Sequence, residues 1–271
     1  MATMCGVLLD RHPAGRFVAV MQAPAQRSSD AKQKTARKRA RRDGEDVTGR
    51  RAVVILGMHR SGTSCLTGTL QEAGLFLGDC HTWNKHNEKG NRENQKFVDL
   101  HDAILEANAG AWDAPPAKVT WGGEHIARAK ALLADHAGEA NFGFKDPRAL
   151  LVLDGWKMLF PALEFVGIYR HPNAVAKSLE KRRSKSRDES LQLWYAYNRV
   201  LYREYKKKPF PILNFDDDEA VLDEKIFSVA GKMGLVHRSG DEKFYTADLR
   251  HNDGTGGPSL PWKVRRLYNK L

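Results

Sequence analysis

Short apolar runs alternate with longer amphipathic segments along most of this chain. Four runs rich in Val, Ile, Leu and Phe have the length of buried strands, and the segments between them repeat apolar residues at helical spacing. Strands that alternate with helices are typical of a parallel sheet with helices on both faces. We therefore expect an α/β fold, arranged as a three-layer α/β/α structure around a central parallel sheet. The expected strands are 52–57, 142–145, 164–169 and 210–215; the expected helices are 63–73, 94–109, 124–136, 149–160, 173–183, 189–207 and 218–233, followed by a short basic helix near the C-terminus.

Positive charge is concentrated near the N-terminus. Residues 1–51 contain twelve Lys or Arg and five Asp or Glu, so they carry +7 of the net charge of +11. The excess is greatest in residues 32–42, where Ala, Gln and Ser separate the basic residues and no aromatic residue occurs. Such a composition cannot build a core. We expect residues 1–50 to be a basic, disordered tail, solvated or bound to an acidic surface such as nucleic acid, and residues 51–271 to form one domain.

The cysteines and the hydropathy pattern indicate a cytoplasmic protein. Cys5, Cys65 and Cys80 form no close pair and leave one cysteine odd, which argues against a disulfide framework. No run approaches the roughly 18 apolar residues needed to span a bilayer. Asp10 and Arg11 interrupt the apolar start of the chain, so no secretory signal is predicted. We expect no membrane span.

Residues 53–64 form the strongest functional signal. A Val-Val-Ile-Leu run leads into a Gly/Ser/Thr turn and then into helical spacing. A strand, turn and helix in this order direct backbone N–H groups and the positive end of the helix dipole at one point, which suits phosphate or sulfate. The loop places Arg60 before Gly62 and lacks the Lys of the GxxxxGK[ST] loop of nucleoside-triphosphate enzymes. The sequence predicts an anion site built from Arg60, Ser61, Gly62, Thr63 and Ser64.

A second strand-to-helix junction follows at residues 165–172. The strand ends in Arg170, and Pro172 suits the first turn of the next helix. Ser178 lies eight residues beyond Arg170, so it falls within that helix. An arginine at a strand end and a hydroxyl on the following helix can both reach one phosphate. Arg170 could equally be an ordinary surface arginine, and both interpretations stay open at this point.

Together the two junctions resemble the sulfotransferase family that uses 3′-phosphoadenosine 5′-phosphosulfate (PAPS). The Arg60–Ser64 loop resembles the family's loop for the 5′-phosphosulfate, with Arg where many members have Lys. Arg170 with Ser178 resembles the pair that binds the 3′-phosphate, spacing included. The resemblance covers residues 51–271 and implies the P-loop-containing nucleotide hydrolase-like fold of these enzymes.

Two further segments carry the resemblance. Residues 143–148, Gly-Phe-Lys-Asp-Pro-Arg, are similar to the Lys-Asp-Pro segment of the protein-tyrosine, carbohydrate-type and many bacterial branches. Residues 211–217 resemble the strand and acidic turn that come late in the fold. We expect the chain to belong with the bacterial or carbohydrate-type branch.

The resemblance implies sulfuryl transfer by in-line displacement, with PAPS as donor and 3′,5′-bisphosphoadenosine (PAP) as product. Arg60 is then expected beside the leaving oxygen, and Lys145 is expected to be a second catalytic cation. Alternatively, Lys145 pairs with Asp146 and only shapes the turn. Because protein cations and amides can neutralise the developing charge, no metal is required.

A base that takes the acceptor's proton is expected in the polar segment 78–94. Glu93 fits the Gly-x-x-Glu pattern of bacterial members best, with His86 and His81 as alternatives. Glu93 could instead only favour the N-terminus of the next helix through the helix dipole.

Two other functions compete with this interpretation. A P-loop kinase is the nearest rival, but Arg60 stands where such an enzyme would need its nucleotide-binding Lys. Residues 32–42 suggest a nucleic-acid-binding protein, yet no aromatic interleaving or groove-reading motif supports one. The sequence specifies neither the oligomeric state nor the acceptor, which could be a carbohydrate, a lipid, a small molecule or a peptide hydroxyl.

Overall fold

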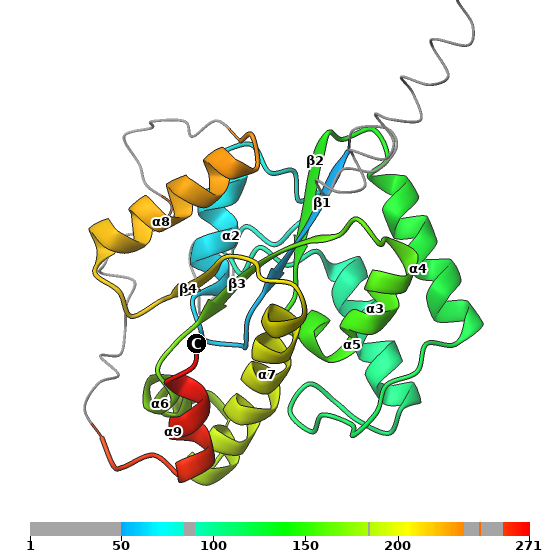
Figure 1. Cartoon of the computed structure of the whole chain (residues 1–271). Helices are drawn as coiled ribbons and strands as arrows, with labels where there is room; N and C mark the ends of the chain where they lie inside the picture. Colours follow the sequence, from blue (N-terminus) through cyan, green and yellow to red (C-terminus); the bar gives the residue numbers. More distant parts are fainter. Residues whose placement is uncertain (1–49, 84–89, 184, 236–243, 245–256) are drawn as a thin grey trace, which may run out of the picture.

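A parallel sheet forms the centre of the protein. The computed structural model describes residues 50–83, 90–183, 185–235, 244 and 257–271. Within them, β1 (Arg51–Leu56), β2 (Asn141–Lys145), β3 (Glu164–Tyr169) and β4 (Ile212–Asn214) pair in the order β2-β1-β3-β4, all parallel (Figure 1). The carboxyl ends of all four strands therefore lie at the same edge. The expected α/β fold with a central parallel sheet is confirmed.

Helices cover both faces of this sheet (Figure 1). One face carries α2 and α8, and the other carries α3, α4, α5 and α7, with α6 and α9 beside α7. The bounds are α2 (Thr63–Glu72), α3 (Gln95–Ala107), α4 (Gly123–Asp135), α5 (Ala149–Leu159), α6 (Pro172–Arg183), α7 (Arg187–Lys207), α8 (Glu219–Lys232) and α9 (Trp262–Tyr268). The seven expected helices with stated bounds agree with the observed ones to within two residues at each end. Among the described helices, none is both long enough and apolar enough to cross a bilayer.

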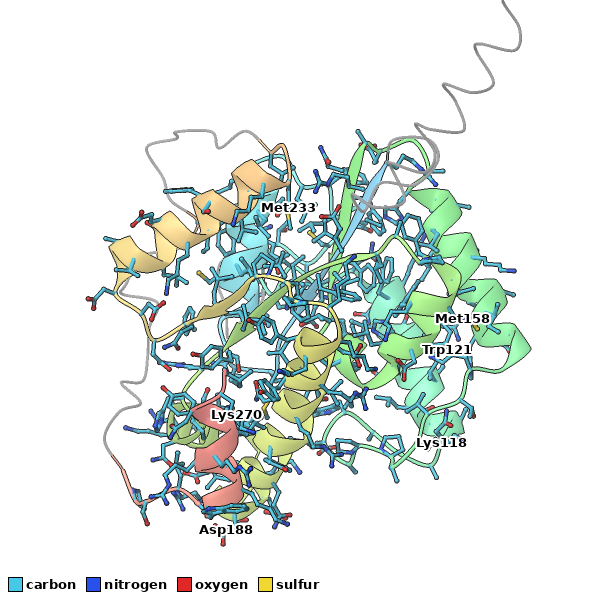
Figure 2. The ribbon with its side chains drawn as sticks, viewed as in Figure 1. Lys118, Trp121, Met158, Asp188, Met233 and Lys270 are labelled. Carbon is cyan, nitrogen blue, oxygen red and sulfur yellow. The ribbon has the colours of Figure 1, made fainter. Side chains whose placement is uncertain are left out.

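Alternate residues of β1 supply two separate apolar cores. Val53 and Ile55 belong to the cluster under α2 and α8, whereas Val54 and Leu56 belong to the cluster under α3, α5 and α7. Successive side chains of a strand point to opposite faces, so one apolar strand can serve both layers. In Figure 2, the labelled Met233 lies at the α8 side and Trp121 at the α4 and α5 side of the sheet.

Strand β4 is shorter than expected. The sequence predicts residues 210–215, but the strand spans Ile212–Asn214, with a flanking backbone hydrogen bond from Phe215 N to the Tyr169 carbonyl at 2.8 Å. Pro211 has no N–H to donate to the ladder, although its carbonyl accepts from Gly167 N at 2.8 Å. Apart from Arg50, the expected tail with its basic run 32–42 lies outside the described residues.

Candidate functional site

A tight loop joins β1 to α2. Gly57 follows the strand, and a Cβ there would lie 2.6 Å from the Ile168 carbonyl oxygen of β3, so only glycine fits. Arg60 (φ 67°) and Gly62 (φ 85°) then adopt left-handed backbone conformations on either side of Ser61. A left-handed arginine is an uncommon, strained conformation, and such strain is concentrated at functional sites.

At the N-terminus of α2, several backbone N–H groups that lack an intrahelical acceptor lie close to one hydroxyl that has no hydrogen-bond partner in the described chain. Gly62 is the N-cap and provides no side-chain cap, so the first N–H groups of the helix, including those of Thr63 and Ser64, have no intrahelical acceptor. Ser61 is fully buried, yet its Oγ has no hydrogen-bond partner in the described part of the chain. Unpaired N–H groups, a helix N-terminus and a hydroxyl are the groups that can hold an anion, and we call this arrangement the candidate anion cradle.

The loop contacts the second basic junction. Arg60 Nε donates a hydrogen bond to Ser178 Oγ on α6 at 2.7 Å. On the other side, a Cβ on Gly62 would lie 2.1 Å from the Phe215 ring, and the Arg170 guanidinium carbon lies 5.1 Å from the centre of that ring. The two basic junctions, which the sequence separates by more than 100 residues, therefore lie side by side at the carboxyl edge of the sheet.

Arg170 is held in place by the turn after β4. The residue is 5% exposed, and its Nε lies 3.2 Å from Asp216 Oδ1. The other oxygen of Asp216 accepts a hydrogen bond from the His171 backbone N–H at 2.6 Å. Arg170 is thus a buried, oriented cation and not an ordinary surface arginine.

Lys145 and Glu93 form an ion pair beside the loop. Lys145 ends β2 and is almost completely buried, with its Nζ 2.7 Å from Glu93 Oε1. The other carboxylate oxygen accepts from Asn91 Nδ2 at 3.0 Å, and the Asn91 carbonyl accepts from Ser64 Oγ at 3.2 Å. This chain of contacts links the Lys-Asp-Pro segment to the first turn of α2.

The structure bears on the alternative roles considered for Glu93 and Lys145. Asn94 is the N-cap of α3, because its side chain accepts from the Lys96 N–H at 3.0 Å. Glu93 immediately precedes this cap, so an interaction of its charge with the helix dipole is compatible with its ion pair. Lys145 pairs with Glu93 instead of Asp146. His81 lies beside Glu93 through a backbone hydrogen bond of 2.9 Å from His81 N to Glu93 O. His86 lies outside the described residues.

Asp146 is the centre of a buried hydrogen-bond network. Trp156 Nε1 donates to His101 Nε2 at 2.8 Å, so the imidazole proton is on Nδ1, which donates to Asp146 Oδ2 at 2.7 Å. Arg148 donates to Asp146 Oδ1 from both its backbone N–H and its guanidinium, and it also pairs with Asp102 at 2.6 Å. Burial alone would raise the pKa of Asp146, but His101 and Arg148 outweigh burial and hold that pKa well below its ordinary value.

Asp146→Ala is expected to lower the free energy of unfolding by about 3 kcal/mol, because it leaves buried donors of His101 and Arg148 without their acceptor. A carboxyl with a depressed folded pKa stabilises the protein above its unfolded pKa of about 4 and loses that contribution as the pH falls further. Urea denaturation of the wild type and the variant at neutral pH measures the loss of stability, and the same comparison at about pH 3 should give a smaller difference. Asp154→Ala is the matched control, because its carboxylate is 75% exposed and pairs with Lys157 at the surface. Equal stability of the two variants at neutral pH would contradict the prediction.

His59 precedes Arg60 in the loop and packs against two aromatic rings. Its ring centre lies 4.6 Å from that of Trp112 and 6.0 Å from that of Tyr197. Its Nε2 is buried and has no hydrogen-bond partner among the described residues. Burial, reinforced by the positive charge of Arg148, lowers the pKa of His59 to about 3, so the imidazole is neutral near neutral pH.

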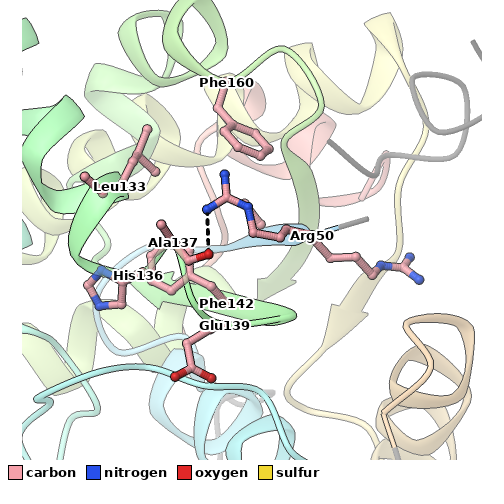
Figure 3. Close-up of a pocket in the computed structure, with 10 residues that line it drawn as sticks. Arg50, Leu133, His136, Ala137, Glu139, Phe142 and Phe160 are labelled. Carbon is pink, nitrogen blue, oxygen red and sulfur yellow. Dashed lines mark hydrogen bonds between the residues drawn. The ribbon is translucent and has the colours of Figure 1, made fainter. Parts of the chain in front are cut away.

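A separate pocket opens at the opposite edge of the sheet (Figure 3). It has a volume of about 210 Å³ and is lined by residues at the starts of β1 and β2 and at the ends of α4 and α5, among them Arg50, Phe142 and Phe160. Arg50 donates to the Ala137 carbonyl at 3.1 Å across it. The candidate anion cradle lies at the carboxyl ends of the strands, so this pocket is not part of that site.

Comparison with solved structures identifies the fold. The sulfotransferase domain of the olefin synthase from Synechococcus PCC 7002 superposes with a TM-score of 0.52 at 16% identity, covering 81% of this chain and 94% of that domain. The sulfotransferase domain from the curacin biosynthetic pathway gives a TM-score of 0.50 at 14% identity, covering 80% of this chain and 96% of that domain. The chain has the sulfotransferase fold. Comparison of the sequence with protein-family models and with curated proteins finds no match.

In this sulfotransferase-fold chain, the residues that the sequence singled out lie together. Hydrogen bonds, ring contacts and one ion pair connect the loop 60–64 with Arg170, Ser178, Lys145 and Glu93. The matches bear out the resemblance at the level of the fold and leave its branch open.

Sequence reasoning missed the partners of these residues. No role was predicted for Asp216, which orients Arg170, for Arg148 or for His59. The signal for His59 was its position within the anion loop.

Proposed function

We propose that this protein is a PAPS-dependent sulfotransferase that moves a sulfuryl group to a hydroxyl or amine of an acceptor. The observation that supports it best is the contact between the two junctions: Arg60 Nε lies 2.7 Å from Ser178 Oγ, although the two residues are 118 positions apart. A donor with anionic groups at both ends needs two cationic sites next to each other, and Arg60 and Arg170 both lie at the carboxyl edge of this sheet, which supports the proposal. The fold comparison is consistent with this proposal.

The unpaired groups of the loop suit the 5′ end of such a donor. The first N–H groups of α2 and the partnerless Ser61 hydroxyl would hold the 5′-phosphate. Arg170, buried and oriented by Asp216, would bind the 3′-phosphate together with Ser178. The bound donor supplies a sulfuryl group whose bond to the bridging oxygen breaks as a bond to the acceptor forms, leaving PAP.

Three side chains would act on the transfer itself. Arg60 and Lys145 place positive charge where negative charge develops, and they are fixed before the reaction by Ser178 and Glu93. Glu93 is the proposed base that accepts the acceptor's proton, and its ion pair with Lys145 orients the carboxylate. No step in this assignment needs a metal.

Thermal unfolding with nucleotides tests the proposal and separates it from a kinase. PAP is expected to raise the unfolding temperature of the full chain, whereas ATP with magnesium leaves it unchanged, because only a protein that binds a ligand in its folded state is stabilised by it. Arg170→Ala should weaken PAP binding about tenfold or more by removing a charge-assisted contact. Arg203→Ala, at an exposed arginine of α7, is the matched control and should bind PAP as the wild type does.

The opposite pattern would overturn the proposal. Stabilisation by ATP with magnesium but not by PAP would identify a kinase-like protein, and unchanged PAP affinity in Arg170→Ala would remove the proposed 3′-phosphate site. Transfer itself is tested by incubating the protein with labelled PAPS and a panel of carbohydrate, lipid, phenolic and peptide acceptors.

A further inference from the structure

His59 is distinguished from the other described histidines by a buried ring nitrogen, Nε2, that has no hydrogen-bond partner among the described residues. By contrast, both ring nitrogens of His101 are hydrogen bonded, and His136 Nδ1 bonds to the Leu132 carbonyl at 2.7 Å. A buried polar group without a partner destabilises a protein by about 1–3 kcal/mol. Its presence in a loop that also contains the partnerless Ser61 hydroxyl points to a ligand.

The charges around His59 indicate which ligand group belongs there. Beyond burial, Arg148, Lys145 and Arg60 lower the pKa of its ring, whereas Asp146 raises it. Lys145 also pairs with Glu93, and Arg148 pairs with Asp102 and Asp146. Cations this close to the ring favour a ligand group that carries anionic oxygens. Burial keeps the imidazole uncharged, so such a group meets a neutral ring that can donate one N–H.

We propose that His59 Nε2–H donates a hydrogen bond to a sulfuryl oxygen of the bound donor. This inference rests on the proposed function. The N–H groups of α2 and the Ser61 hydroxyl are the partners for the 5′-phosphate. The sulfuryl group would extend from that phosphate toward the proposed catalytic cation Lys145, which is one of the charges that act on the His59 ring. Packing against Trp112 fixes the direction of the ring.

A pair of substitutions separates hydrogen bonding from packing. Gln can place its amide nitrogen where Nε2 lies but has no ring, whereas Phe keeps a ring against Trp112 but has no N–H. If His59 binds the sulfuryl group, His59→Phe should weaken binding of PAPS relative to PAP by about tenfold, the effect of one hydrogen bond to a charged group. His59→Gln should retain most of the wild-type ratio. His59→Asn, whose amide matches Nδ1, is the matched control and should behave like His59→Phe.

The affinities of the full chain for PAPS and PAP, measured by calorimetry without acceptor, test this inference. An unchanged ratio in His59→Phe, or a loss in His59→Gln with retention in His59→Phe, would show that the ring only packs and would overturn the inference alone. A wild-type protein that binds neither nucleotide would overturn both the inference and the proposed function.

A second measurement needs no variant. In wild-type protein labelled with ¹⁵N histidine, the Nε2 resonance of the ring that contacts Trp112 should shift with PAPS and not with PAP. The same shift with both nucleotides, or with neither, would exclude a contact with the sulfuryl group.

Discussion

Arg60→Ala is expected to lower turnover about a thousandfold, because it removes a preorganised positive charge from the place where the leaving oxygen becomes anionic. The hydrogen bond to Ser178 holds the guanidinium before the donor arrives, so the side chain needs little reorganisation during transfer. Turnover is measured with labelled PAPS and an acceptor found in the screen. Affinity for PAP should fall far less than turnover, since the α2 N-terminus and Arg170 remain.

The backbone of Arg60 provides a matched control for this variant. Its φ of 67° is unfavourable for Ala as well as for Arg but not for Gly. Arg60→Gly should therefore lose turnover as Arg60→Ala does, while it unfolds at the same or a higher temperature than Arg60→Ala. Arg60→Lys should recover part of the rate because it keeps the charge. Recovery of turnover in Arg60→Gly would show that backbone strain, and not the lost charge, had inactivated the Ala variant.

Lys145→Ala is expected to reduce turnover by about a hundredfold or more, for two reasons that act together. The change removes a cation near the transferring group, and it leaves the Glu93 carboxylate without the partner that orients it at 2.7 Å. Steady-state turnover and donor affinity of the variant are measured separately, and the loss should appear mainly in turnover.

A double-mutant cycle with Glu93→Gln separates the two reasons. If the ion pair acts as a unit, the double variant should be far faster than the product of the two single effects predicts. Glu93→Gln alone should cut turnover and spare PAP affinity. Full turnover in Glu93→Gln would show that Glu93 is not the base. His86 and His81 would then be the next candidates for that role. Strict additivity would show that Lys145 acts independently of Glu93.

The partner of Lys145 illustrates what the sequence pattern could and could not predict. Successive residues at a strand end point to opposite sides, so Lys145 and Asp146 were poorly placed to pair with each other. In the structure, Asp146 bonds to His101 in the buried network that includes Trp156. Lys145 bonds to Glu93, which lies 52 positions away along the chain. Alternation disfavours a Lys145–Asp146 pair without excluding it, and no local pattern identifies Glu93 as the partner of Lys145.

Local chemistry determined much of this protein. Apolar periodicity of two and of 3.6 residues places the strands and helices to within a few residues, and the loop at 57–64 predicts an anion site, because both signals depend on neighbours in the chain. Only the tertiary structure decided which distant residues meet: Arg60 with Ser178, Arg170 with Asp216, and His59 among Trp112 and the surrounding charges. The strand order β2-β1-β3-β4 brings those loops to one edge, and that order results from packing the whole sheet between its two layers of helices.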